Sequence, residues 1–363
     1  MRFDVTQALD AIEQSLTTDA ALAQAVVDLG EVAWFVELDG GREVNLLRAG
    51  HLVDAFARYI GQDAVAVYPV AGRALLADQS LTSKERMVLG RWSDDGLIEV
   101  VPRIEDRVAE VADLTGLPVL TRALPPGLEH RYPWLRHQPG RVLWLRAHQG
   151  GAALNGAPPP PAEPGGAGAM LLGRVWACPR RECPSFGVRR LVTQSVPHLR
   201  AGVPSCPRHG EPLVNAGARP PAMVLVVVID GKVRTRFVVR AGRPAVVGRA
   251  PEQPDGLAVG SWLREESVAM VSRTHVRLEL HGDALRVTDL STNGTVIRTR
   301  GTPATPAEQI QLAGGQTQVI GRFDIVELHE GVELVPVDAL ASKSGSAPGS
   351  VMGDAPTISI RPP

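Results

Sequence analysis

The last third of the chain is patterned as an all-β structure. Between residues 218 and 337, short apolar runs alternate with turn sequences; these runs include residues 223–229, 245–247, 276–280 and 284–290. The turns between them carry pairs such as Asp230-Gly231 and Asn293-Gly294. Short strands separated by turn pairs at this spacing are typical of an antiparallel sandwich. We therefore expect residues 218–337 to form an all-β sandwich.

Three polar motifs lie at the expected strand ends of this segment. They are Gly248-Arg249, then Ser272-Arg273-Thr274-His275, and then Asn293-Gly294. Loops at one end of a sandwich converge, so residues far apart in sequence can form a single site on a rigid scaffold. A guanidinium, a hydroxyl and an amide are suited to holding a phosphate and a peptide backbone.

With these motifs in this order, residues from about 223 to 335 resemble a forkhead-associated (FHA) domain, a family of phosphothreonine-peptide readers. The resemblance implies that Arg249 and Ser272 bind the phosphate and that Asn293 binds the ligand main chain. It also implies supporting roles for Gly248, His275 and Gly294 and places Arg273 and Thr274 in the peptide-binding set. An arginine suits this task, because its guanidinium pairs with phosphate oxygens in a bidentate fork that lysine cannot copy.

Two features of the segment leave alternatives open. Asn293-Gly294 is a hairpin-turn signal even without a ligand. The stretch from Arg249 to Ser272 is long, which places an extra loop beside the site. Ligand selectivity is therefore open.

All three cysteines fall within one short segment. Cys178 and Cys183 form one close pair, and Cys206 and His209 form a second. This Cys3His set has the spacing of a zinc ribbon, whereas a disulfide would leave one cysteine over. We expect residues 169–217 to be a small zinc-ribbon-like module. Four protein ligands leave no open position on the zinc, so its role would be structural.

Residues 1–150 are expected to form an α/β domain. Apolar spacing predicts a helix over 17–29, a strand over 32–38 and a helix over 50–60, and later a helix followed by a strand over 107–120. The order faintly resembles a CBS-type module, but residues 47–51 lack its Thr/Ser-x-x-Asp ligand step. We expect an interaction or dimerisation domain, through which the chain could self-associate.

Two segments have the composition of irregular structure. Residues 151–168 include the unbroken run Pro158–Pro161 and are predicted to be a semi-stiff linker. Residues 338–363 are rich in Ser, Gly, Ala and Pro and are predicted to be a disordered tail. Thr357 in this tail has Ile360 three places on, which makes it a candidate phosphosite for the chain's own FHA-like domain, with an inert tail as the alternative.

Composition excludes several functional classes. The net charge is −1, and the longest apolar run, residues 222–229, has the length of a strand. No signal-peptide core, Walker loop or hydrolase motif is present. We expect a cytoplasmic protein that is not an enzyme. The use of arginine over lysine is typical of a GC-rich bacterial genome.

The favoured interpretation is a multidomain, non-catalytic adaptor that binds a threonine-phosphorylated protein in a bacterial Ser/Thr kinase pathway. The alternative is a phospho-regulated regulator that binds nucleic acid. Its basis is a set of six arginines between Cys178 and His209: Arg180, Arg181, Arg189, Arg190, Arg200 and Arg208. Several of these charges could instead offset a negative zinc centre, so we regard nucleic-acid binding as the weaker hypothesis.

Overall fold

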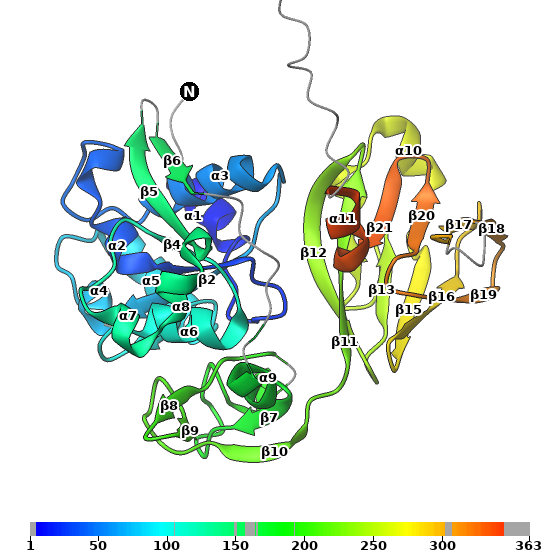
Figure 1. The fold of residues 1–363 in the computed structure, drawn as a ribbon. Helices are drawn as coiled ribbons and strands as arrows, with labels where there is room; N and C mark the ends of the chain where they lie inside the picture. The colour runs from blue at the N-terminus through cyan, green and yellow to red at the C-terminus, as the bar shows by residue number, and fades with distance from the viewer. Residues whose placement is uncertain are drawn as a thin grey trace, which may run out of the picture. The chain divides into compact units, whose positions relative to one another are not determined.

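The computed structural model describes residues 5–104, 106–148, 151–156, 164, 166–191, 193–301 and 307–344. It divides into two compact units, Met1–Pro220 with Lys232–Val238, and Pro221–Gly231 with Val239–Pro363 (Figure 1). Pro158–Pro161 and the candidate phosphosite Thr357 lie outside the described residues. No helix among the described residues is both long and apolar enough to cross a membrane.

The first unit contains a six-stranded sheet in the order β3-β2-β1-β4-β5-β6. Its strands are β1 (Ala25–Asp28), β2 (Val67–Gly72), β3 (Glu99–Val101), β4 (Val119–Thr121), β5 (Val142–His148) and β6 (Gly151–Asn155). The first five are parallel, and β6 is antiparallel to β5. Strand β1 is central, because Val26 pairs with both Tyr68 and Val119. This is the strand order of a doubly wound α/β fold.

Helices cover both faces of this sheet. They are α1 (Val5–Glu13), α2 (Leu29–Ala33), α3 (Arg48–Ile60), α4 (Arg73–Leu76), α5 (Ser83–Asp94), α6 (Arg107–Thr115), α7 (Leu128–Arg131) and α8 (Trp134–His137), with 3-10 turns η1 (Val36–Leu38) and η2 (Pro139–Arg141). Val27 of β1 lies in one core with Leu52 of α3 and Trp92 of α5. Its neighbour Val26 lies in the other core with Val111 of α6. Successive residues of a strand face opposite sides, so β1 is apolar on both.

The sequence predicted some of these elements and missed others. The helix expected over 50–60 is α3, and the helix and strand expected over 107–120 are α6 and β4. The helix over 17–29 is wrong, since this stretch contains β1, and the strand over 32–38 is wrong, since α2 and η1 occupy it. Asp28 ends β1 and caps α2 by accepting a hydrogen bond from the amide of Glu31 (3.0 Å).

The cysteines lie in a small β-rich module that packs as part of the first unit. It contains α9 (Gly166–Leu172), β7 (Arg174–Ala177), η3 (Val188–Arg190), β8 (His198–Arg200), β9 (Val203–Ser205) and β10 (Val214–Ala218). Strands β7 and β10 form one antiparallel pair, and β8 and β9 form another. The segment expected to begin the linker, residues 151–155, is instead the edge strand β6.

The second unit forms a β-sandwich, as the sequence predicted; the sheet that contains β11 also includes β12, although Lys232–Val238 of that strand are grouped with the first unit. One sheet has the order β12-β11-β21-β20-β17-β18 and the other β14-β13-β15-β16-β19. The strands are β11 (Ala222–Ile229), β12 (Lys232–Arg240), β13 (Ala245–Gly248), β14 (Leu257–Ala258), β15 (Val276–His281), β16 (Ala284–Asp289), β17 (Thr295–Arg298), β18 (Gln309–Leu312), β19 (Thr317–Ile320), β20 (Ile325–His329) and β21 (Val332–Pro336). Alternate residues of β15, Val276, Leu278 and Leu280, are buried, as expected for a strand with one face in the core.

Three short helical elements complete the second unit. They are η4 (Gly260–Trp262), α10 (Glu265–Met270) and α11 (Val337–Ser344). The first two lie in the long loop between β13 and β15. Helix α11 occupies the first residues of the segment expected to be a disordered tail, and residues beyond 344 are outside the described part of the chain.

Candidate functional site

Two loops at one end of the sandwich run close together at Gly248. This residue ends β13, and Arg249 follows it. The backbone amide of Arg249 donates to the carbonyl of Ser272 (2.9 Å), and the amide of Ala250 donates to the carbonyl of Arg273 (3.2 Å). A Cβ atom at position 248 would collide with the Arg273 carbonyl oxygen. Glycine at this position therefore allows the close approach of Arg249 to Ser272.

Arg249 carries a positive charge that no acidic side chain of the described residues pairs with. Its side chain is half-buried, and its Nε is buried without a hydrogen-bond acceptor. Arg264 in the same domain, by contrast, pairs with Asp230 (2.7 Å). A partly desolvated guanidinium without a partner favours binding of an anion.

The Ser272 hydroxyl is held in place by a hydrogen bond that it accepts. Its Oγ accepts a hydrogen bond from the amide of Thr292 (3.1 Å). A hydroxyl that accepts in this way still has its own proton to donate. This contact also joins the Ser272 loop to the turn that carries Asn293.

His275 is a buried strut between these two loops. Its side chain is fully buried, and its Nδ1 accepts a hydrogen bond from the amide of Ser272 (3.0 Å). The ring proton therefore sits on Nε2, which donates to the carbonyl of Gly294 (3.2 Å). Burial lowers the pKa of His275 below its ordinary value. The neutral ring can thus make both contacts.

The turn from residue 289 to residue 295 is held by a buried carboxylate. Asp289 accepts hydrogen bonds from the hydroxyls of Ser291 (2.7 Å) and Thr295 (2.5 Å). The Ser291 hydroxyl in turn accepts from the amide of Gly294 (2.8 Å), whose φ is +87°. No role for Asp289, Ser291 or Thr295 was predicted from the sequence. The available signal was an aspartate two residues before a serine, which is typical of an Asx-turn.

Asn293 contacts the extra loop. Its Nδ2 donates to the carbonyl of Met270 at the end of α10 (3.0 Å), and the Asn293 side chain is exposed. The same loop is bound to the strand end where the amide of Gly260 donates to the carbonyl of Arg249 (3.1 Å). Met270 is a further residue that the sequence analysis missed. The contact of Met270 with Asn293 depends on the fold of the long loop between β13 and β15, and the local sequence pattern does not reveal that fold.

The remaining two predicted site residues lie on the same loop as Ser272. Arg273 is exposed, and its nearest acidic partner is Glu252 at 3.9 Å. Thr274 is half-buried. Hydrogen bonds thus link the backbone of Arg249 to Ser272, and the Ser272 side chain to the turn that carries Asn293.

The state of His275 leads to a prediction about pH. Because burial lowers its pKa in the folded protein, the unfolded chain takes up this proton first as the pH falls. The free energy of unfolding of the sandwich should therefore decrease below about pH 6.5, the ordinary value for histidine. Chemical denaturation at pH 7.5 and pH 5.5 measures this. The decrease should be smaller in His275→Gln and unchanged in His281→Gln, an exposed control. Equal decreases in all three proteins would contradict the role of His275.

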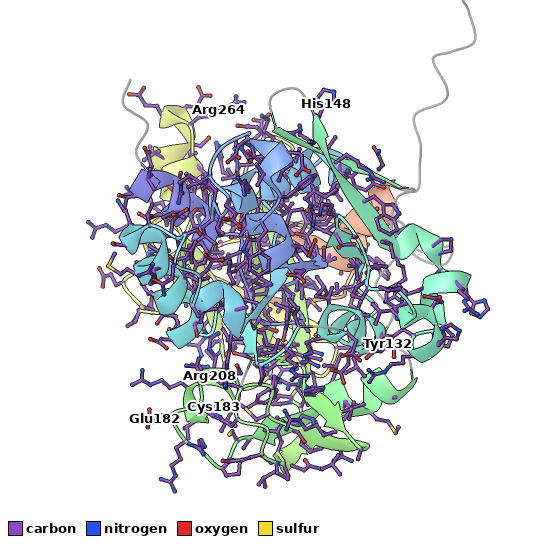
Figure 2. The ribbon with its side chains drawn as sticks, turned by 90° about the vertical axis from the view of Figure 1, so that its left-hand side faces the viewer. Tyr132, His148, Glu182, Cys183, Arg208 and Arg264 are labelled. Atoms are coloured by element: carbon purple, nitrogen blue, oxygen red, sulfur yellow. The ribbon has the colours of Figure 1, made fainter. Side chains whose placement is uncertain are left out.

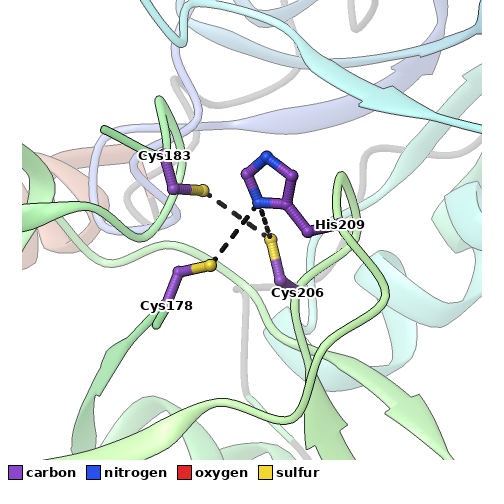
Figure 3. Close-up of side chains that lie close together, drawn as sticks. All are labelled: Cys178, Cys183, Cys206 and His209. Atoms are coloured by element: carbon purple, nitrogen blue, oxygen red, sulfur yellow. Dashed lines mark hydrogen bonds between the residues drawn. The ribbon is translucent and has the colours of Figure 1, made fainter. Parts of the chain in front are cut away.

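The four predicted metal ligands lie together in the small module (Figure 3). One ligand atom from each of Cys178, Cys183, Cys206 and His209 lies within 4.8 Å of the others. His209 Nδ1 is 3.5 Å from the Cys178 Sγ and 3.4 Å from the Cys206 Sγ. The sulfur atoms of Cys183 and Cys206 are 3.7 Å apart, and all three cysteines are free and buried. The structure thus contains a Cys3His cluster that could hold a metal ion.

Hydrogen bonds favour the thiolate form of Cys183, which is the form that binds metals. The Cys206 side chain lies in hydrogen-bond contact, and the amide of Phe186 donates to the Cys183 Sγ (3.3 Å). These contacts outweigh burial and lower the pKa of Cys183 to about 5, while the same sulfur–sulfur contact, together with burial, raises the pKa of Cys206. A buried sulfur with amide donors is suited to carry negative charge beside a cation.

Comparison with known proteins identifies the sandwich. Residues 246–321 match the family model of the FHA domain. This part of the chain is an FHA domain. The match begins in β13, just before Arg249, and covers Ser272, His275 and Asn293. No curated protein matches the chain.

Solved FHA domains are similar to part of this chain. The FHA domain of human APLF in complex with an XRCC1 bisphospho peptide is 19% identical, covers 31% of this chain and 97% of its own, and has a TM-score of 0.22. A structure from an analysis of phosphothreonine-dependent FHA interactions is 24% identical, with coverages of 32% and 95% and a TM-score of 0.20. The FhaA FHA domain complexed with the intracellular domain of Rv3910 is 25% identical, with coverages of 31% and 98% and a TM-score of 0.19.

Proposed function

We propose that the FHA domain binds phosphothreonine-containing proteins and that the chain acts as a non-catalytic adaptor. The observation that carries this proposal is Arg249: its half-buried guanidinium has no acidic partner among the described residues, and its backbone amide donates to the carbonyl of Ser272. A phosphothreonine supplies the missing charge, since it carries nearly two negative charges and three acceptor oxygens. Asn293 would hold the ligand main chain, and Arg273 and Thr274 would line its path.

The phosphate donor in this proposal is a bacterial Ser/Thr kinase. The arginine-rich, lysine-poor composition of the chain supports a bacterial origin. Self-association through the α/β sheet of the first unit, the cytoplasmic location and phosphorylation of Thr357 stay predictions.

We further propose that the Cys3His cluster binds structural zinc. Tetrahedral zinc with bonds of about 2.3 Å to sulfur and about 2.0–2.1 Å to nitrogen separates two sulfurs by about 3.8 Å, and a sulfur from a nitrogen by about 3.6 Å. Three of the six distances in the cluster, 3.7 Å, 3.5 Å and 3.4 Å, agree with these values, and all six are within 4.8 Å. Zinc would cross-link a module that has few apolar residues of its own.

No observation favours the alternative of nucleic-acid binding. Three of the six arginines that suggested it are engaged within the first unit. Arg180 pairs with Glu211 (2.9 Å). Arg208 donates to the hydroxyl of Ser93 (3.0 Å), and Arg190 is half-buried, with its guanidinium close to Gly96. These arginines are therefore engaged within the protein, where they support the structure of the module.

An affinity capture from cell extract tests the proposed adaptor function. The wild-type protein should retain partners from an untreated extract and lose them when the extract is first treated with a phosphatase. Arg249→Ala should lose the same partners, whereas Arg286→Ala, an exposed arginine on β16, should retain them. Partners that resist phosphatase and bind the Arg249→Ala protein equally would refute phospho-dependent binding by this site.

A further inference from the structure

A fully buried arginine joins the α/β sheet to the module that carries the Cys3His cluster. Arg107 begins α6 and is 2% exposed. Its guanidinium pairs with Glu99 of β3 (2.6 Å) and with Glu110 of α6 (2.6 Å). It also donates to the carbonyls of Val196 (2.7 Å) and Pro197 (3.2 Å), which belong to the cysteine-bearing segment.

These contacts use the whole hydrogen-bonding capacity of the guanidinium. Arg107 has five N–H donors, and the structure gives it five hydrogen bonds, three to carboxylates and two to carbonyls. If the segment at Val196 and Pro197 moved away, two donors of a buried cation would lose their acceptors. Unpaired polar groups in the interior are costly, so the α/β core depends on this segment.

The same segment makes further contacts with the α/β sheet on both sides of Val196. The Glu110 carboxylate accepts from the amide of Leu199 (3.0 Å). The Asp19 carboxylate accepts from the amide of Gln194 (3.1 Å), and the Gln194 carbonyl accepts from Ala20 (3.0 Å). The Val196 side chain is fully buried and packs in the core that contains Val26, Tyr68 and Val119.

Contacts join this segment to the loops that carry the cysteines. The hydroxyl of Ser195 donates to the carbonyl of Ser185 (2.8 Å), two residues after Cys183. Strand β8, which continues the segment, pairs with β9, which ends directly before Cys206. Arg208, between Cys206 and His209, donates to the carbonyl (3.3 Å) and hydroxyl (3.0 Å) of Ser93 at the end of α5. Figure 2 labels Arg208 and, close to it in this view, Cys183.

The module's own cluster of buried side chains around the cysteines is small. Its buried core consists of Cys178, Cys183, Phe186, Cys206 and Leu213. Three of these five residues are the proposed metal ligands, so Phe186 and Leu213 are the apolar side chains of this cluster, whereas Leu172 and Val196 of the module are buried in the core of the sheet. A core of this size cannot offset the entropy of ordering the chain without a cross-link.

We propose that occupancy of the Cys3His cluster controls the folding of the α/β sheet to which it is joined through Arg107. Loss of the metal frees residues 194–199 from their contacts with the α/β part of the first unit. Helix α6 and strand β3 then lose the hydrogen bonds that Arg107 and Glu110 make with these residues. Thermodynamic linkage makes the effect reciprocal, so that weakening the Arg107 contacts weakens metal binding, although Arg107 is not a ligand. This inference rests on the proposed metal site.

Hydrogen exchange of the full chain tests the coupling. Peptides are followed by mass spectrometry in the zinc-loaded protein, after removal of zinc with a chelator, and after zinc is restored. Peptides that cover β3 and α6 should lose protection without zinc and regain it on reloading. Peptides from β15 and β16 of the FHA domain serve as an internal control and should keep theirs.

The reciprocal measurement is zinc affinity by competition with a chromophoric chelator. Arg107→Gln should bind zinc about ten-fold or more weakly than wild type. Arg122→Gln is the matched control, because Arg122 forms a part-exposed ion pair with Glu31 (3.0 Å), and its affinity should match wild type. A protein that binds no zinc would refute the metal site together with the coupling. Bound zinc with unchanged exchange of α6 after its removal, or equal affinities of the two variants, would refute the coupling alone.

Discussion

Replacing Arg249 by alanine should weaken binding of a phosphothreonine peptide by about 2–4 kcal/mol, the cost of leaving a bound charge without its partner. This corresponds to roughly 30-fold to 1,000-fold in Kd. The guanidinium has no acidic partner among the described residues, so its removal takes away the ligand's main charge contact without freeing an internal carboxylate. Isothermal titration calorimetry with wild-type and variant proteins measures the difference.

Two comparisons sharpen this measurement. Ser272→Ala should cost less, about 1 kcal/mol, because it removes one neutral donor while the backbone contact of Arg249 with Ser272 remains. Arg286→Ala also removes one arginine of the domain, yet it should leave the affinity unchanged. A loss in Arg249→Ala no larger than in Arg286→Ala would mean that the phosphate binds elsewhere.

Replacing Cys206 by serine should abolish stoichiometric zinc binding and unfold the metal module. The site would lose a fully buried thiolate ligand in contact with both Cys183 and His209. Structural zinc sites in small peptides contribute about 10–16 kcal/mol of apparent binding free energy, which no other contact in so small a core can replace. Elemental analysis should find one zinc per wild-type chain and none in the variant.

The FHA domain provides the internal control for this variant. Phosphopeptide affinity should stay at the wild-type value, because the FHA domain belongs to the second compact unit and has its own core. Val203→Ala, at an exposed position on β9, should retain zinc. Full zinc content in Cys206→Ser would rule out the proposed ligand set.

The β-sandwich could be predicted because its signals are local. Alternating apolar residues and turn pairs mark β15, β16 and their neighbours, and the cysteine spacing marks the metal cluster. The order of the N-terminal sheet could not be predicted. Val26 and Val27 lie in a stretch whose apolar residues have helical spacing. This stretch forms a strand because it pairs with β2 and β4, some 40 and 90 residues away in the sequence.

The candidate sites divide in the same way. Arg249, Ser272, His275 and Asn293 stand out in the sequence, because each belongs to a recognisable motif. The contacts that support them depend on tertiary structure. The sequence marks Asp289 as the start of an Asx-turn but does not show that its side chain is buried. It also does not show that Arg107 reaches the cysteine-bearing segment nearly ninety residues later.

Phospho-dependent recognition is tested most directly by calorimetry with a pair of peptides that differ in one phosphate. The peptides are drawn from a degenerate library selected on the wild-type protein, and one member of the pair carries phosphothreonine where its twin carries threonine. The phosphorylated peptide should bind the wild-type protein, and its twin should show no measurable heat of binding. Equal affinity for the two peptides would contradict the assignment of Arg249 and Ser272 as a phosphate site.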